Sequence, residues 1–387
     1  MASVNIGNSV INIGEGAFNE CTSLTSVVIP DSVTNISECA FSWCDSLTSI
    51  DIGNSVTSIG DSAFDGCTSL TSVVIPESVT SIGQAAFYGC TSLTSVVIPD
   101  SVRSIGDSVF GHCTSLTTIP DSITNISDWM FRNCTSLTSV EIPDSVTSIG
   151  KRAFEGCTSL TSIVISDSVT SIGNYAFHGC TNLTSVIIGS SVTNIGDSVF
   201  YGCTSLTNIT VDGNNGNYKD IDGNLYTIDG TALIQYALGK TSTSFTILDS
   251  VTGIGDSAFR NCTSLTSVVI PDSVTSIGNY AFQDCTSLTN VEIGDSVKSI
   301  GEAAFERCYK LTSVVIGDSV ESIGAAAFCR CTNLTSIVLP DSVTNIGGMA
   351  FVADESLTSV IIGRPGWPSR PGRCPPAASS AESRGRW

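Results

Sequence analysis

The feature that most constrains this chain is a 23-residue unit that recurs along almost its whole length. The copy at residues 67–89 reads C-T-S-L-T-S-V-V-I-P-E-S-V-T-S-I-G-Q-A-A-F-Y-G. A repeat period of this size is typical of solenoids, in which each repeat forms one coil of a stack. The sequence therefore predicts one elongated repeat domain over residues 1–363 instead of two or three globular domains.

Within one unit, the apolar residues predict a short strand followed by a bend. Leu70, Val73 and Ile75 have the spacing of a strand whose apolar side chains face inward. Pro76 lacks a backbone donor and ends regular pairing. Residues 84–87 follow a glycine bend, and we expect them to form one helical turn.

A single unit is too small to fold alone. Burying its inward side chains yields about 1.5–3 kcal/mol each, whereas ordering each residue of the backbone costs about 1–2 kcal/mol. Stacked coils bury one another's faces, so we expect stability to come from the interfaces between neighbouring coils.

The period changes at two places. The coil at residues 113–133 is two residues short, and a loss of two strand positions keeps the same side chains facing inward. Residues 212–241 do not follow the unit and are predicted to form a β-hairpin insert, because Asp222-Gly223 and Asp229-Gly230 separate short strand-like runs. We expect this insert to project from the strand side or edge without breaking the stack.

The unit resembles the BspA-like, treponemal-type leucine-rich repeats, which combine a 23-residue coil, an I-G-x-x-A-F segment and a Cys or Asn before L-x-x-[IV]-x-I. The resemblance covers residues 4–362 and includes phenylalanines that recur in register: Phe18, Phe41, Phe64, Phe87, Phe110, Phe131, Phe154, Phe177, Phe200, Phe259, Phe282, Phe305, Phe328 and Phe351. The insert also resembles one that this family carries. The resemblance implies a right-handed, mainly β leucine-rich-repeat superhelix with a parallel sheet on one face and short helical turns on the other. It also implies a surface or secreted protein that takes part in adhesion.

The charge of the chain argues against two classes of partner. Five of the 16 basic residues and one of the 36 acidic residues follow residue 363, so residues 1–363 carry a formal net charge of −24. Nucleic acids and anionic membranes require clustered Lys and Arg, so we expect neither as a partner.

The two ends of the chain bear on the location of the protein and on its order. The start, Met1 to Val10, has neither the basic residues nor the apolar run of a signal peptide, and no apolar stretch is long enough for a membrane span. A chain complete as written would be cytoplasmic, whereas the resemblance implies the cell surface, and we leave both open. Residues 364–387 are rich in Pro and Arg and are predicted to be a disordered tail.

Cysteine forms one regular column at the start of the coils. Its members are Cys21, Cys44, Cys67, Cys90, Cys113, Cys134, Cys157, Cys180, Cys203, Cys262, Cys285, Cys308 and Cys331. Neighbouring members are expected about 4.8 Å apart with parallel side chains, which favours buried free thiols over disulfides. The spacing of the cysteines does not predict a zinc site.

An acidic column follows the strands and has two interpretations. Its members are Asp31, Glu77, Asp100, Asp121, Asp144, Asp167, Asp249, Asp272, Asp295, Asp318 and Asp341. Each carboxylate could cap its own turn, or the column could bind divalent cations, although the glycine-rich pattern of calcium-binding coils is missing. The two histidines, His112 and His178, have no evident partner, so we expect no catalytic site, metal or cofactor.

The candidate binding site lies on the strand side. The outward column there is largely aliphatic, which reflects either β-propensity or a partner-binding surface. Because specificity requires irregular residues, the candidate contact residues are those near the insert: Tyr218, Tyr226, Tyr236, Val164, Ile187, Thr210 and Val269. We expect the three tyrosines to act as exposed anchors.

Three functions remain open at this point. The first is a non-catalytic adhesion module that binds a protein or a glycan on the sheet face. The second is a passive structural spacer, which the near-identical repeats favour. The third is a solenoid enzyme acting on carbohydrate, which would need carboxylates converging on one face, whereas the acidic residues here are spread evenly along the chain.

Overall fold

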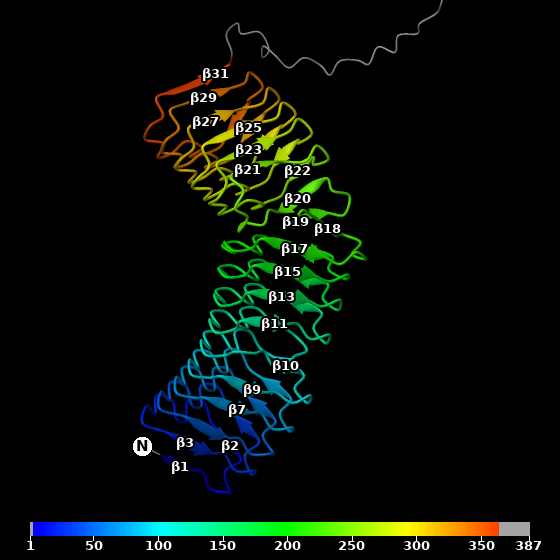
Figure 1. Ribbon diagram of the computed structural model, residues 1–387. Helices are drawn as coiled ribbons and strands as arrows, with labels where there is room; N and C mark the ends of the chain where they lie inside the picture. Colours follow the sequence, from blue (N-terminus) through cyan, green and yellow to red (C-terminus); the bar gives the residue numbers. More distant parts are fainter. Residues whose placement is uncertain (1–2, 364–387) are drawn as a thin grey trace, which may run out of the picture.

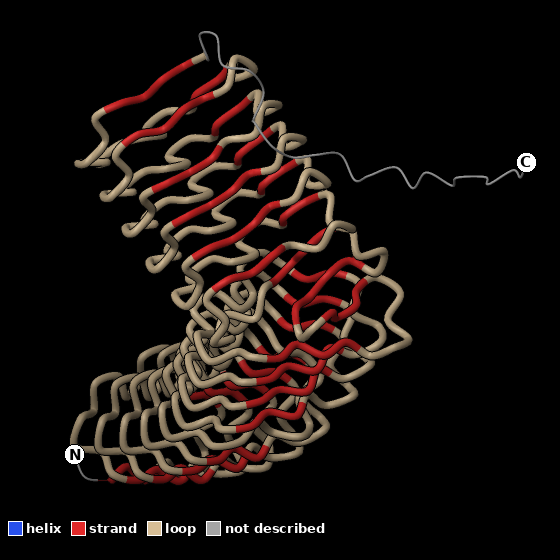
Figure 2. Tube along the Cα trace, turned by 45° about the horizontal axis from the view of Figure 1, so that its top comes forward, coloured by secondary structure: helices blue, strands red, loops and turns tan. Residues whose placement is uncertain are grey.

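The computed structural model describes residues 3–363 and shows a curved stack of coils (Figures 1 and 2). Coils follow one another in sequence order from β1 (Ser3–Asn5) to β31 (Ser359–Ile362). The predicted repeat solenoid is confirmed. Each coil has three sides. We call them the sheet face, which holds the longer strands, and the second ladder, which holds the two-residue strands. The third side is the turn face, which residues 60–67 and their equivalents form. The predicted tail at residues 364–387 lies outside the described residues.

The sheet face is built from one short strand per regular coil. Besides β1 and β31 these are β3 (Ser26–Val28), β5 (Ser49–Asp51), β7 (Ser72–Val74), β9 (Ser95–Val97), β11 (Ser139–Glu141), β13 (Ser162–Ile165), β15 (Ser185–Ile188), β17 (Asn208–Val211), β21 (Ser244–Thr246), β23 (Ser267–Ile270), β25 (Asn290–Ile293), β27 (Ser313–Val315) and β29 (Ser336–Leu339). Pairing is parallel and in register, as in Val73 opposite Val96. Val73 is buried and Val74 is 65% exposed, so the predicted alternation is confirmed.

The second ladder is a set of strands that sequence analysis did not assign. They are β2 (Asn12–Ile13), β4 (Asn35–Ile36), β6 (Ser58–Ile59), β8 (Ser81–Ile82), β10 (Ser104–Ile105), β12 (Ser148–Ile149), β14 (Ser171–Ile172), β16 (Asn194–Ile195), β22 (Gly253–Ile254), β24 (Ser276–Ile277), β26 (Ser299–Ile300), β28 (Ser322–Ile323) and β30 (Asn345–Ile346). Two residues are too few to show a hydrophobic period. Only pairing with the next coil makes these segments strands.

The turn face contains no helix, so the expected helical turn at residues 84–87 and its equivalents is wrong. No helix occurs anywhere in residues 3–363. Ser62 (φ 51°) and Gly66 (φ 70°) adopt left-handed conformations, which interrupt a right-handed helix. The N–H groups of Ser62, Phe64 and Gly66 instead donate to carbonyls of the next coil at 2.8 Å. A helix would use these donors within the coil, so the alternating conformation is what joins the coils on this side.

The core is continuous and repeats the same eight positions. In the coil of residues 67–89 these are Cys67, Leu70, Val73, Ile75, Val79, Ile82, Ala86 and Phe87, all at most 2% exposed. The phenylalanine rings of successive coils stack with centroids 4.6–6.0 Å apart. Each ring therefore fills space that belongs to two coils.

Twelve of the thirteen column cysteines are buried and Cys21 is partly buried, so the predicted burial of the column is largely confirmed. No disulfide joins cysteines within residues 3–363. The Sγ of Cys67 donates to the carbonyl of Phe41 at 3.1 Å, and most members of the column make the same bond to the repeat phenylalanine 24 or 26 residues earlier at 3.1–3.2 Å. Burial raises the pKa of Cys44 to about 11 and that of Cys113 to about 12.

The short coil at residues 113–133 interrupts the sheet face but not the core. No strand occurs between β10 and β11, so this coil contributes none to the sheet face, and Ile126 pairs with Ile149 as an isolated bridge. Leu116, Ile119, Ile123 and Ile126 remain buried. The prediction that the deletion preserves the inward-facing side chains is confirmed.

The insert forms the predicted hairpin and also takes the place of part of a coil. Strands β18 (Tyr218–Ile221) and β19 (Asn224–Thr227) pair antiparallel, and β20 (Ala232–Gln235) pairs antiparallel with β19 and parallel with β22. Both turn residues, Asp222 (φ 50°) and Gly223 (φ 71°), are left-handed, as a two-residue hairpin requires. We expected the insert to project from the strand side or edge without breaking the stack, and its strands lie at the edge of the second ladder, where β20 pairs with β22.

Tyr236 explains how the stack continues past the insert. Its N–H donates to the carbonyl of Ala258, and its ring lies 5.1 Å from that of Phe259, as a phenylalanine of the repeat would. The carbonyl of Tyr236 accepts the Gln235 side-chain amide at 2.8 Å. Cys262 lies 26 residues after Tyr236, the separation at which other column thiols donate to a phenylalanine carbonyl. Its Sγ instead lies 3.7 Å from the Ser264 hydroxyl.

We predict that Phe177→Ala destabilises the protein by about 3–5 kcal/mol, because the ring is fully buried between two stacked neighbours. Phe351→Ala, at a partly buried ring stacked on one described neighbour, should cost clearly less. Denaturant unfolding of both variants measures the difference. Equal losses would contradict a core shared between adjacent coils.

We also predict that the buried column cysteines, from Cys44 to Cys331, react slowly with iodoacetamide in the native state, because burial blocks access and raises thiol pKa. Cys39, which is only partly buried and lies outside the column, is the internal reference and should be alkylated before them. Mass spectrometry of time points gives the order. Finding Cys157 alkylated as fast as Cys39, or held in a disulfide, would refute the prediction.

Candidate functional site

The candidate contact residues on the sheet face lie side by side. Glu141, Val164, Ile187 and Thr210 occupy the same outward position in β11, β13, β15 and β17 and pair directly across the strands. Val164 is 43% and Ile187 45% exposed. We call the four strands β11, β13, β15 and β17 the central sheet. It presents two adjacent aliphatic side chains to solvent.

The central sheet is bounded by both irregular segments. The strandless short coil precedes β11, and the insert follows β17. The N–H of Val211 in β17 donates to the Asp220 carboxylate of the insert at 2.9 Å. Val269 belongs to β23, which lies beyond the insert in a separate sheet. The structure therefore groups Val164, Ile187 and Thr210, and places Val269 apart from them.

The tyrosines do not provide the expected exposed anchors. Tyr226 is 1% and Tyr236 0% exposed, so the prediction that they reach the surface is wrong. Tyr236 fills the phenylalanine position of the repeat, and burial raises the pKa of Tyr226 to about 12. Tyr218 is partly exposed, and its hydroxyl donates to the carbonyl of Thr193 at 3.4 Å.

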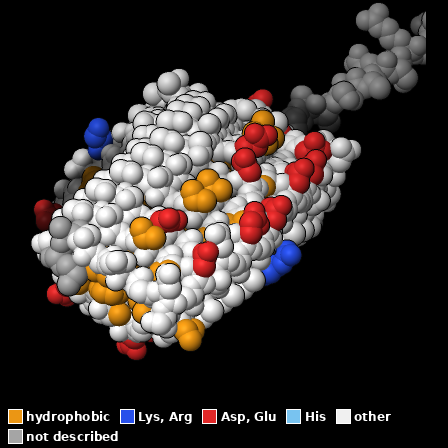
Figure 3. Space-filling view, turned by 90° about the horizontal axis from the view of Figure 1, so that it is seen from below, with side chains coloured by type: hydrophobic (Ala, Val, Ile, Leu, Met, Phe, Trp, Pro, Cys, Tyr) orange, Lys and Arg blue, Asp and Glu red, His pale blue; other side chains and the backbone are white. Residues whose placement is uncertain are grey.

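The outward column as a whole combines aliphatic and acidic side chains. Val28, Val74 and Val97 are 57–65% exposed, and Asp51, Glu141 and Glu292 occupy the equivalent position in other strands. No Lys or Arg occurs in the described strands of the sheet face. Figure 3 shows apolar and acidic side chains close together on the face seen from below, with few basic ones.

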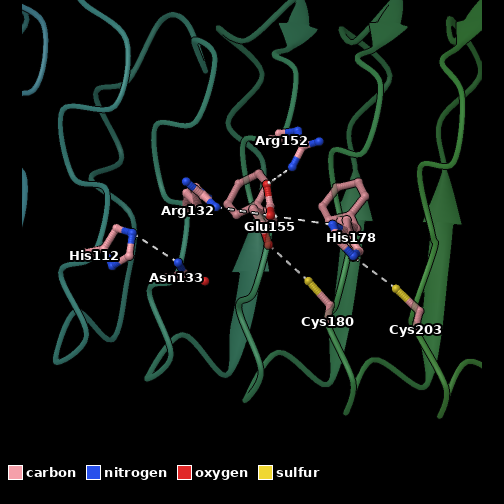
Figure 4. Close-up of polar contacts among 10 residues, drawn as sticks. His112, Arg132, Asn133, Arg152, Glu155, His178, Cys180 and Cys203 are labelled. Atoms are coloured by element: carbon pink, nitrogen blue, oxygen red, sulfur yellow. Dashed lines mark hydrogen bonds and ion pairs between the residues drawn. The ribbon is translucent and has the colours of Figure 1, made fainter.

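The turn face holds a polar cluster that sequence analysis missed. Glu155 is 9% exposed and is contacted by Arg152 at 2.9 Å, Arg132 at 3.4 Å and His178 Nδ1 at 3.6 Å (Figure 4). His112 Nε2 lies 3.1 Å from the Asn133 side-chain nitrogen. The expectation that both histidines lack partners is therefore wrong. Reading the residue after each repeat phenylalanine as a column would have found Arg132, Glu155 and His178 on adjacent coils.

The contacts of this cluster connect neighbouring coils. Burial lowers the pKa of His178 below its usual value. The nearby Cys180 and Cys203 thiols donate to the carbonyls of Phe154 and Phe177 at 3.1 Å, so neither forms a Cys-His pair (Figure 4). The contacts continue from coil to coil: His178 stacks on Tyr201 at 4.7 Å, and the Arg260 guanidinium lies 4.0 Å from the Tyr201 ring. Residues 201 and 260 flank the insert in sequence, so these side chains join the coils on either side of it.

Several members of the acidic column cap turns of the neighbouring coil. Carboxylates of Asp31, Asp167 and Asp272 accept the backbone N–H of the next coil at 2.6–2.8 Å. The bond from Ser190 holds the pKa of Asp167 below its usual range. No group of three or more His, Cys, Asp or Glu side chains suited to a metal occurs in residues 3–363. The capping interpretation is thus supported, with the partner in the neighbouring coil instead of in the same turn.

The chain was compared with known proteins. It matches the family described as BspA type leucine-rich repeat region (6 copies) over residues 1–117, 115–226 and 235–364. Among curated proteins nothing matches. None of the secondary structure in residues 3–363 is a helix of the length and apolarity needed to span a membrane.

Several solved structures are similar. A leucine-rich cell surface protein of Faecalibacterium prausnitzii A2-165 is 38% identical, with a TM-score of 0.69 over 79% of this chain and 83% of that one. A leucine-rich repeat protein of Bacteroides ovatus is 31% identical, with a TM-score of 0.51 over 92% and 78%. The pneumococcal vaccine antigen PcpA is 21% identical and shares the fold, with a TM-score of 0.59 over 93% and 82%. The repeat pattern, the solenoid and these matches agree, and the chain belongs to the BspA-type leucine-rich repeat family.

Proposed function

We propose that this chain is a non-catalytic interaction module that binds a protein partner on its sheet face. The observation that carries the proposal is the pair Val164 and Ile187, two adjacent aliphatic side chains held 43% and 45% exposed on a rigid sheet. Apolar surface that the fold leaves uncovered gains most from a partner that removes it from water. Its similarity to a leucine-rich cell surface protein supports a location at the cell surface.

A protein partner fits this surface better than a glycan. Glycan sites commonly offer exposed aromatic rings, and Tyr226 and Tyr236 are buried. Phe245 is the single aromatic residue in the described strands of the sheet face, and it packs against Tyr236 with ring centroids 4.9 Å apart. A catalytic function has less support, because the Glu155 carboxylate is engaged by three side chains and the thiols beside it face the core.

The alternative function is a passive spacer. Valine at the outward position recurs in many coils, and β-branched residues favour strands regardless of binding. The two functions predict different effects of substitutions in the central sheet. A binding site makes Val164 and Ile187 more important than the equivalent valines elsewhere, whereas a spacer makes all of them equal.

We predict that the double variant Val164→Thr, Ile187→Thr weakens binding to a protein ligand about tenfold, or about 1.4 kcal/mol, because it removes methyl groups from the contact while keeping β-branched shape. The matched control is Val74→Thr, Val97→Thr, at the same position of β7 and β9. Biolayer interferometry against purified cell-surface and extracellular-matrix proteins identifies ligands and compares the variants.

Two outcomes would contradict the proposal. One is an equal loss of affinity from both double variants, which would mean that the central sheet has no special role. The other is the absence of any protein ligand for the wild-type chain in the panel, which would favour the spacer. Far-UV circular dichroism checks that all variants keep the fold.

A further inference from the structure

The central sheet is bordered by exposed carboxylates. Glu141 precedes Val164 in the outward column, and Asp144 and Asp167 follow β11 and β13 in the same coils. All three side chains belong to exposed residues. The five ion pairs found in residues 3–363 lie on the turn face and involve none of them. These negative charges are therefore not neutralised by a nearby basic side chain.

Most basic side chains lie away from the central sheet. Of the 11 Lys and Arg residues in the first 363 residues, six belong to the turn face: Arg132, Lys151, Arg152, Arg260, Arg307 and Arg330. The insert that follows β17 carries two, Lys219 and Lys240. The described strands of the sheet face contain none. The charged residues in the described strands of the sheet face are thus all acidic: Asp51, Glu141 and Glu292.

The repeat itself does not explain Glu141. Asp167 caps the next coil through a bond to the Ser190 N–H, so its carboxylate has a structural role. Glu141 is the last residue of β11, at the outward position where half of the other sheet-face strands have valine, and Glu is disfavoured in strands. No hydrogen bond of its carboxylate to another described residue was found. The described residues therefore leave the Glu141 carboxylate free to contact a partner.

We propose that the central sheet selects a cationic segment of a protein, whose aliphatic side chains cover Val164 and Ile187 and whose Lys or Arg side chains meet Glu141, Asp144 and Asp167. This inference rests on the proposed function and specifies its partner. Opposite charges at the border of an interface increase the rate of association and exclude partners of the wrong sign. An acidic segment would meet unpaired like charges in the same place.

The test uses two synthetic peptides of equal length, one alternating leucine with lysine and one alternating leucine with glutamate. Fluorescence anisotropy of the labelled peptides gives their affinities for the full chain. We expect the lysine peptide to bind at least about tenfold more tightly, and its affinity to fall as salt is raised, because exposed charge pairs are screened. Glu141→Gln, Asp144→Asn should weaken it about threefold. Glu77→Gln, an exposed carboxylate beside β7, should leave it unchanged.

The variants separate failure of this inference from failure of the proposed function. Equal binding of both peptides, with affinity lost in the Val164→Thr, Ile187→Thr variant, would overturn the preference for cations and leave binding on the sheet face standing. If Glu77→Gln lowered the affinity for the lysine peptide as much as the Glu141→Gln, Asp144→Asn variant, the attraction would come from the overall negative charge. That result would overturn the inference. Lysine-peptide binding that none of these substitutions alters would count against both proposals.

Discussion

The structure depends on hydrogen bonds that cross from one coil to the next. On the turn face, the N–H groups of Ser62, Phe64 and Gly66 donate to the following coil and not within their own. Strands of the sheet face and of the second ladder also pair with those of the next coil, and the capping Asp carboxylates accept N–H groups from the next coil. A coil by itself can satisfy few of these donors, and buried unpaired donors are costly. The repeat is therefore stable only as a stack, and each coil fixes the conformation of its neighbours.

This dependence explains how the stack tolerates its two irregular segments. At the short coil, the sheet face loses a strand, but the turn-face bonds and the phenylalanine stack between Phe110 and Phe131 continue. At the insert, Tyr236 and β20 supply a ring and a second-ladder strand in place of repeat residues. The polar contacts of Tyr201 with His178 and Arg260 join the coils on both sides. Irregularity on the sheet face is possible because the other sides keep the coils together, and it is this irregularity that delimits the candidate site.

Much of the fold could be predicted from the sequence because each repeat copies the same constraint. The inward positions, the hairpin at Asp222-Gly223 and the reduced cysteines follow from local spacing and turn chemistry. The turn face could not be predicted in the same way, since A-A-F is a good helical sequence and only the neighbouring coil favours left-handed residues such as Ala85. The burial of Tyr236 likewise depends on its position beside Phe259, which no local pattern reveals. For the candidate site, the outward column was predictable, whereas the grouping of Glu141, Val164 and Ile187 between two interruptions required the structure.

The central claim is that bonds between coils on the turn face keep the stack continuous where the sheet face is interrupted. Hydrogen exchange of the short coil tests it most directly, because the N–H groups of Ser108, Phe110 and His112 donate across it at 2.9, 3.0 and 2.6 Å. The account predicts that these amides are protected as strongly as those of Phe64 and Gly66 in a regular coil. Exchange at the rate of an exposed loop across residues 106–133 would contradict it and would divide the solenoid into two independent stacks.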